Sequence, residues 1–180
     1  WPVCADGEGI SLILLDPSSN PDHTLAASWA GSAQVGGFLG GSLQPLTYEL
    51  WQSYVFTSKQ ASGPSDDPDG DGLPNLVEFF LGSLPGKNDA VARGPRASIT
   101  DTNGEDYLTF SFSQLLGQTE VTGLVEVSSN LTDWSSSSAG IKEILPAVPN
   151  GNGSVRRTFR VASPVSDVAK QFLRLRVIEN

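Results

Sequence analysis

The sequence predicts a mainly β protein whose C-terminal half is an antiparallel β-sandwich. Three observations support this fold class. Hydrophobic residues make up 38% of the chain and charged residues only 17%, while 19 glycines and 12 prolines divide it into short segments. Glycines and prolines at this frequency favour strands and turns over long helices. Several segments alternate apolar and polar residues, as half-buried strands do. Asn-Gly pairs, which accept the positive φ of tight hairpins, lie next to some of them.

Residues 1–42 contain one apolar stretch, Ile10–Leu15, interrupted only by Ser11. This pattern is typical of a strand buried on both faces. A turn-rich segment then leads to Trp29, and the glycine-rich GGFLGG predicts a linker at the end of this region.

Residues 43–93 are predicted to form a helical linker. The segment LTYELWQSYVF predicts a short amphipathic helix, and Pro45 just before it suits a helix start. Its apolar residues at helical spacing are Leu46, Leu50, Trp51 and Tyr54. A second short helix is expected from about Asn75 to Leu81, with Gly82 as its C-terminal stop.

Residues 94–180 are predicted to form the sandwich. Four segments have strand alternation, namely YLTFSFS, GLVEVSS, SVRRTFRV and QFLRLRV. In the second, Glu126 is expected to point outward between Val125 and Val127. Hairpin turns are expected at Asn103-Gly104 and at the Asn-Gly pairs within 150–153. The residues expected on buried faces include Leu108, Phe110, Phe112, Leu173, Leu175 and Val177.

The stretch DDPDGDGLPNLVEFF, residues 66–80, concentrates acids just before an apolar segment. Numbered from its second aspartate, it matches the calcium-loop template D-x-[DN]-x-[DN]-G-x5-E at every fixed position. Carboxylates at alternate positions would point into the loop, and the glycine at the sixth position permits its reversal. The predicted ligands are Asp67, Asp69, Asp71, Leu73 through its carbonyl, Asn75 directly or through water, and Glu78 with both oxygens.

The ion expected at this loop is Ca²⁺. All-oxygen, carboxylate-rich coordination favours a hard cation over zinc or copper, and magnesium resists losing its waters. The alternative is an acidic, solvated loop that caps the following helix, with Asp71 as a reasonable N-cap. A structural clamp is expected rather than a paired, opening EF-hand, because the sequence offers no second loop of this pattern.

Three stretches resemble known protein modules. DPDGDGLPNLVEFFLGSLP is similar to a single calcium loop, related to dockerin and thrombospondin type-3 loops, in large secreted proteins of bacteria such as Verrucomicrobia and Planctomycetes. The first 37 residues resemble the closing strands of a bacterial lamin-tail domain. The matching positions are Asp6-Gly7, Gly9, Ser11-Leu12, Asp16-Pro17 and Trp29. YLTFSF, VEVSSNLTDW and FLRLRV resemble the β-domain that follows such calcium loops. None of these families implies a catalytic residue.

An enzyme is not expected. His23 is the only histidine and Cys4 the only cysteine, and no G-x-S-x-G motif is present. These residues also give no zinc set. The acids of the DTNGED turn, Asp101, Glu105 and Asp106, have no ion-loop spacing and are read as a solvated hairpin.

Four arginines alternate outward on two predicted strands: Arg156, Arg160, Arg174 and Arg176. If those strands were neighbours, the arginines would form a basic stripe able to bind an anionic polysaccharide. Pairing with cross-strand acids such as Glu126 is the other interpretation. Trp51, Trp134 and Tyr107 are candidates for stacking on sugar rings, although large aromatic residues in small domains are usually core residues.

The sequence as a whole predicts a non-catalytic, calcium-stabilised module of a secreted or cell-surface bacterial protein, processed from a precursor. The formal charge of −9 argues against nucleic acid as a partner. No apolar run approaches the roughly 20 residues of a membrane span. Strand addition from other copies or from an upstream segment of the precursor is expected to complete the N-terminal strands. The alternative function is a carbohydrate-binding accessory module of a secreted polysaccharide-degrading enzyme.

Overall fold

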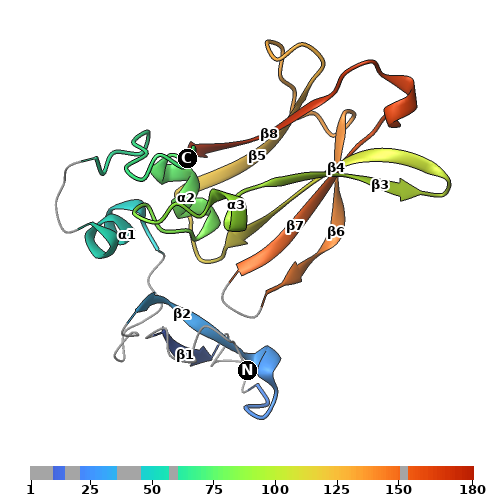
Figure 1. Ribbon diagram of the computed structural model, residues 1–180. Coiled ribbons are helices and arrows are strands. Elements are labelled where there is room, and N and C mark those ends of the chain that lie inside the picture. The colour runs from blue at the N-terminus through green and yellow to red at the C-terminus, as the bar shows by residue number, and fades with distance from the viewer. Residues whose placement is uncertain (1–9, 15–20, 36–45, 57–60, 151–153) are drawn as a thin grey trace.

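The computed structural model describes residues 10–14, 21–35, 46–56, 61–150 and 154–180 (Figure 1). Within these ranges the protein is mainly β, with antiparallel sheets and a few short helices, which confirms the predicted fold class. No helix in the described ranges is long and apolar enough to cross a bilayer.

The larger sheet has four antiparallel strands in the order β3-β4-β7-β6. Their bounds are β3 Arg96–Thr102, β4 Glu105–Leu115, β6 Ile141–Pro149 and β7 Ser154–Val161. The β3–β4 hairpin turns at Asn103 and Gly104, whose φ values of 58° and 86° confirm the predicted Asn-Gly turn. The Asn-Gly residues at 151–153 lie outside the described residues.

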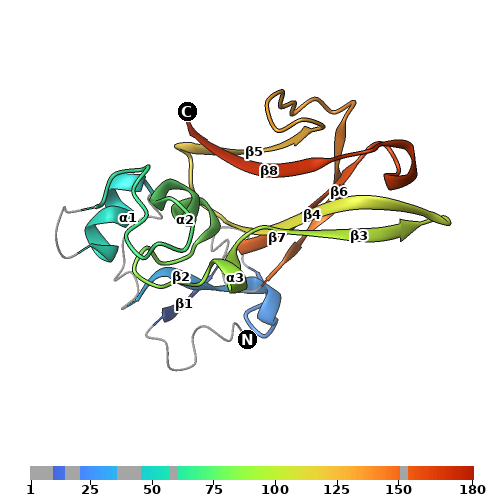
Figure 2. The same cartoon turned by 45° about the horizontal axis from the view of Figure 1, so that its top comes forward.

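A second layer is formed by β5 (Val121–Ser128) and β8 (Phe172–Glu179), which pair antiparallel over their whole length. This pair lies over one face of the four-stranded sheet, giving the sandwich-like arrangement (Figure 2). The core between the layers contains the predicted inward residues Phe110 and Phe112 of β4 and Val125 of β5. The predicted inward residues of β8, Leu173, Leu175 and Val177, pack against this core.

Three α-helices are described. They are α1 Tyr48–Val55, α2 Asn75–Leu81 and α3 Ala90–Arg93, and short 3-10 turns η3 and η4 occupy Ala26–Ser28 and Val165–Asp167. Both predicted helices are therefore confirmed. The N-cap of α1 is Thr47, whose side chain accepts a hydrogen bond from the Leu50 N–H at 3.1 Å. Helix α2 ends at Gly82, whose φ of 76° is the left-handed conformation typical of a helix stop.

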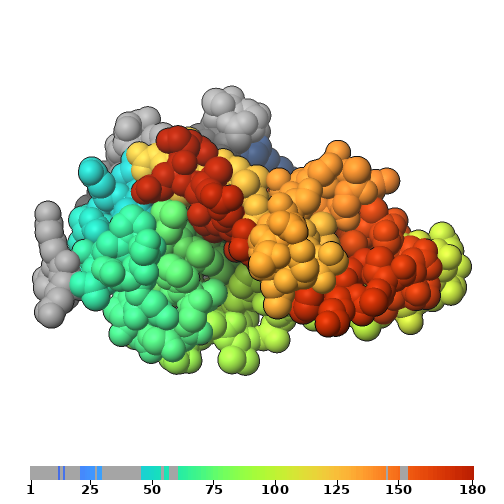
Figure 3. Space-filling model, turned by 90° about the horizontal axis from the view of Figure 1, so that it is seen from above, coloured from blue at the N-terminus to red at the C-terminus, as the bar shows by residue number. Residues whose placement is uncertain are grey.

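Helix α2 lies at one end of the two layers (Figure 1) and inserts its phenylalanine side chains into their core. Phe79 and Phe80 are both 0% exposed. The Phe80 ring lies 5.9 Å from that of Phe112, while Phe79 contacts Tyr48 and Trp51 of α1 at ring distances of 5.5 Å. Figure 3 shows the segment around α2 and the end of β8 side by side on one face. The helical segment and the sandwich thus share one core.

The turn between β4 and β5 adds polar contacts to this packing. The Glu120 carboxylate accepts a hydrogen bond from the Tyr48 N–H at 3.0 Å, and the Gly117 carbonyl accepts one from the Leu46 N–H at 3.1 Å. The side-chain amide of Gln118 donates to the Phe79 carbonyl. One turn of the sandwich therefore holds both α1 and α2.

The N-terminal strands form a hairpin sheet of their own, in which β1 (Ile10–Leu14) pairs antiparallel with β2 (Trp29–Val35). The predicted strand is confirmed over Ile10–Leu14, and Leu15 and Cys4 lie outside the described residues. The prediction of burial on both faces is wrong for Leu12, which is 39% exposed. Among the residues that the structure describes, the β1–β2 pair is a sheet of only two strands, and such a pair leaves a face open to solvent.

The predicted solvent exposure of Glu126 is wrong. Glu126 was expected to point to solvent, yet it is only 6% exposed. Arg174, its cross-strand neighbour on β8, covers it with an Nε–Oε2 distance of 2.6 Å. Arg176 approaches the other oxygen, with an Nη1–Oε1 distance of 3.8 Å. The alternation rule places Glu126 on the outer face correctly, but it does not predict which long side chains fold over that face.

Candidate metal centre

In the acidic loop before α2, the aspartate carboxylates accept hydrogen bonds from backbone N–H groups of the same loop. Asp67 accepts hydrogen bonds from the N–H groups of Gly70 and Gly72 at 2.9 and 3.0 Å. Asp69 accepts one from the Asp71 N–H at 3.2 Å. Gly70 and Gly72 have φ values of 71° and 92°, a conformation that residues with a side chain rarely adopt. The two glycines therefore permit the reversals that bring alternate aspartates to one side.

Five carboxylates meet in two overlapping groups. Asp67, Asp69 and Asp71 form the first group, and in each group one ligand atom per residue lies within 4.8 Å of the others. The second group shares Asp71 and adds Glu78 and Asp89. Carboxylates at such distances repel each other unless a positive charge lies among them. The loop, α2 and the segment before α3 thus converge on one acidic centre.

Asp71 joins the two groups because its two oxygens have different partners. One oxygen accepts a hydrogen bond from the Leu73 N–H at 2.9 Å, within the loop. The other accepts from the backbone N–H groups of Asp89 and Ala90 at 3.0 and 2.8 Å. These contacts hold the start of α3 against the loop. They bring Asp89 into the centre, although it lies far beyond the loop in sequence.

Glu78 is the most deeply buried member of the centre. It is 0% exposed and precedes the core residues Phe79 and Phe80 on α2. Burial, together with the charges of Asp69 and Asp71, raises the pKa of Glu78 from 4.5 to about 8. Its Oε1 has a long contact of 3.4 Å with the Ser83 hydroxyl, and its Oε2 is buried without a hydrogen-bond partner.

Two further oxygens of the centre are buried without a hydrogen-bond partner, Oδ2 of Asp69 and Oδ1 of Asp89. Burial also raises the pKa of Asp69, and the nearby Asp71 carboxylate adds to this effect. Asp89 is 8% exposed, and its other oxygen pairs with Arg93 at 3.3 Å. Buried polar atoms are normally satisfied, so three orphaned acceptors in one cluster call for a missing partner.

The donor set fits a hard divalent cation. Only oxygen ligands are present in the two groups, and the acceptors that lack partners are carboxylate oxygens. Calcium takes six to eight such oxygens in flexible geometry, whereas zinc prefers nitrogen and sulfur. The acidic group of Asp71, Glu78 and Asp89 can therefore hold a metal ion.

The other two predicted ligands have defined positions as well. The side chain of Leu73 packs against the hydrophobic core. Because that side chain has no oxygen, the backbone carbonyl is the only oxygen that Leu73 can offer. Asn75 is 0% exposed, and its amide nitrogen donates to the carbonyls of Ala61 and Gly63 at 3.0 and 2.8 Å. Its Oδ1 is buried without a hydrogen-bond partner. Asn75 thus ties the preceding segment to α2.

Asp89 is the member of the centre that the loop template does not contain. The template ends at Glu78, and the segment GKNDAVAR after it has no metal-loop spacing. The available signal was an aspartate directly before a short helical segment, a position suited to helix capping. Asp89 immediately precedes α3. The Asp71 carboxylate accepts hydrogen bonds from the backbone N–H groups of Asp89 and Ala90 at this helix start.

The four arginines do not form one stripe on paired strands. Arg156 and Arg160 lie on β7 and Arg174 and Arg176 on β8, and these strands belong to different sheets. Arg160 lies over the Tyr107 ring at 4.2 Å, and Arg174 lies over the Trp134 ring at 4.1 Å. Two of the four arginines thus each lie over one face of an aromatic ring, and Trp51 is a core residue.

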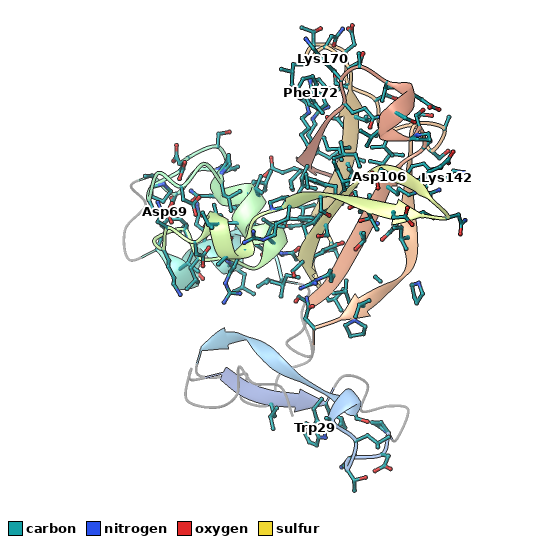
Figure 4. The ribbon with its side chains drawn as sticks, turned by 45° about the vertical axis from the view of Figure 1, so that its right-hand side comes forward. Trp29, Asp69, Asp106, Lys142, Lys170 and Phe172 are labelled. Atoms are coloured by element: carbon teal, nitrogen blue, oxygen red, sulfur yellow. The ribbon has the colours of Figure 1, made fainter. Side chains whose placement is uncertain are left out.

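The remaining acidic and histidine candidates are exposed. Asp106, in the β3–β4 hairpin, and Asp69 lie at opposite ends of the molecule (Figure 4). Asp101 accepts a long hydrogen bond of 3.4 Å from the Gly104 N–H, as expected of a turn residue. His23 packs edge-on against Trp29 at 5.8 Å. In the described structure, Asp101, Asp106 and His23 belong to neither of the residue groups that could hold a metal.

Comparison of this chain with protein-family models, with curated proteins and with solved structures finds no match. The assignment of a function therefore depends on the chemistry of the centre itself.

Proposed function

We propose that this chain is a non-catalytic structural module of a secreted or cell-surface protein, stabilised by Ca²⁺ bound at the acidic loop. The observation that carries the proposal is the buried, unpartnered Oε2 of Glu78 at the start of the shared core. A carboxylate in this position is costly unless a cation offsets its charge. The proposed ligands are those of the loop template, with Glu78 as the one that reaches into the fold.

The stabilising action follows from the position of α2. Glu78 is followed directly by Phe79 and Phe80, which are the most buried aromatic residues of the core. An ion that holds Glu78 ionised and in place fixes α2, and α2 in turn fixes the contacts with α1 and the sandwich. Extracellular calcium modules bind with Kd values of about 10⁻⁴ to 10⁻³ M, so extracellular calcium would keep the site filled.

The proposal is tested by thermal unfolding in excess calcium and in chelator. We expect a higher Tm in calcium, with magnesium at the same concentration giving a smaller rise. Glu78→Gln should lose most of the calcium effect, while Glu49→Gln, at an exposed acid on α1, should retain it. Identical melts of the unsubstituted chain in calcium and chelator would reject the proposal.

We propose further that the β1–β2 hairpin is the assembly element of the module. Two strands alone are marginally stable in water, and Leu12 is left 39% exposed. A strand from a second copy would extend the hairpin at its edge and bring cross-strand side chains against Leu12. Light scattering after size exclusion should show concentration-dependent oligomers that Leu12→Lys abolishes. A monomer at every concentration would contradict this part of the proposal.

A further inference from the structure

The acidic centre has more negative charge than one divalent ion offsets. Two groups of carboxylates, sharing Asp71, comprise five residues in total. When ionised they carry five negative charges, of which the Arg93 guanidinium, at 3.3 Å from Asp89, offsets one. A single Ca²⁺ would leave two charges uncompensated in a centre that includes the buried Glu78 and Asp89. Two divalent ions would bring the sum to zero.

The positions of the oxygens also indicate two ions. Calcium binds oxygen at 2.3–2.6 Å, so ligand atoms of one ion lie at most about 5 Å apart. In the structure the carboxylates satisfy this limit as two groups of three and not as one group of five. The first group belongs to the loop, and the second is formed by Asp71, Glu78 and Asp89.

The orphaned acceptors provide an independent observation in each group. Asp69 Oδ2 belongs to the first group, whereas Glu78 Oε2 and Asp89 Oδ1 belong to the second. Glu78 is fully buried and Asp89 more than nine-tenths buried, so bulk water does not satisfy them. Each group thus has at least one oxygen for which the described residues provide no donor.

We propose that this centre binds two calcium ions, the first at Asp67, Asp69 and Asp71 and the second at Asp71, Glu78 and Asp89. Asp71 is the bridging ligand, and Glu78, the last ligand of the loop template, binds the second ion instead of the first. This inference rests on the proposed function, and it adds a site that the loop template does not contain. The second ion connects the loop, α2 and the start of α3, because its three ligands come from those three segments. Arg93 acts as a positioning residue that holds Asp89 through its other oxygen.

The test is a count of bound calcium by equilibrium dialysis of the whole chain, with total calcium measured on both sides of the membrane. The free concentration should extend from about 10⁻⁵ to 10⁻² M, to cover the extracellular range. Potassium chloride at near-physiological strength screens loose binding to surface acids. We expect two ions per chain, one after Asp89→Asn, and two in the control Asp101→Asn, which changes an exposed acid of the β3–β4 hairpin.

The outcomes separate this inference from the proposed function. One ion per unsubstituted chain would overturn the second site and leave the calcium-stabilised module intact, whereas no bound ion would overturn both. Two ions retained in Asp89→Asn would overturn the assignment of Asp89. The count in the unsubstituted chain decides the number of sites even if a variant fails to fold, and circular dichroism in calcium identifies such a variant.

Discussion

The ring of Phe80 occupies the place where a side chain at residue 123 would lie. A Cβ added to Gly123 on β5 would be 2.2 Å from the Cζ of Phe80, a distance that atoms do not tolerate. Phe80 is 0% exposed and comes two residues after Glu78 on α2. The strand therefore lacks a side chain at the point where α2 enters the sandwich, and the acidic centre is connected to the core through this contact.

Gly123→Ala should weaken the docking of α2. The methyl group would meet the Phe80 ring, and overpacking of a core typically costs about 1–3 kcal/mol. The free energy of unfolding, measured with urea in calcium, should fall by that amount. Gly86→Ala is the matched control, because a Cβ at Gly86 has no atom within 4 Å. Equal stability of the two variants would show that the Phe80–Gly123 contact does not limit the fold.

The metal-free protein should become less stable as the pH rises. Glu78 has a pKa of about 8 in the folded chain and an ordinary value of 4.5. Because the folded-state pKa is raised, the neutral form favours folding, and this contribution is full below pH 4.5 and lost as the pH approaches 8. Urea unfolding in chelator across this range should show the loss. Glu78→Gln should flatten the profile, and a variant profile as steep as that of the unsubstituted chain would contradict the assignment.

Removal of Glu126 should destabilise the β5–β8 layer. Its carboxylate is 6% exposed and pairs with Arg174 at 2.6 Å. Glu126→Ala leaves that guanidinium without its acceptor, and hydrogen bonds to charged groups contribute about 1.5–3 kcal/mol. The loss should lie at the low end of this range, because Arg174 is 43% exposed and water replaces part of the contact. Urea unfolding measures it, with Glu105→Ala at an exposed hairpin acid as the control.

Predictions from local sequence patterns were confirmed where a few neighbouring residues determine the backbone conformation. Asn103 and Gly104 adopt positive φ because few other residues accept it at low cost. Helix α2 ends at Gly82 for the same reason. The aspartates of the loop converge at alternate positions, and the positive φ of Gly70 and Gly72 permits the reversals between them. Each of these features depends on neighbours only a few residues away.

Features that depend on distant contacts were not predicted. Asp89 joins the centre through hydrogen bonds from its own N–H and that of Ala90 to Asp71, a contact between segments that no spacing rule connects. Glu126 is buried because Arg174 and Arg176 fold over it. The β7 and β8 arginines were expected to form a stripe only if their strands were neighbours. Strand order, which places them in separate sheets, is not encoded in the alternation of either strand.

The measurement that tests the central claim most directly is the free energy of unfolding as a function of free calcium. A ligand that binds only the folded chain adds RT ln(1 + [Ca²⁺]/Kd) for each site. Above the Kd, stability should therefore rise by about 1.4 kcal/mol per tenfold increase in calcium for each bound ion. The account predicts such a rise in the unsubstituted chain and a smaller rise in Glu78→Gln, which lacks a ligand of the second ion. A free energy of unfolding that does not change with calcium would contradict the claim that the ion is part of the fold.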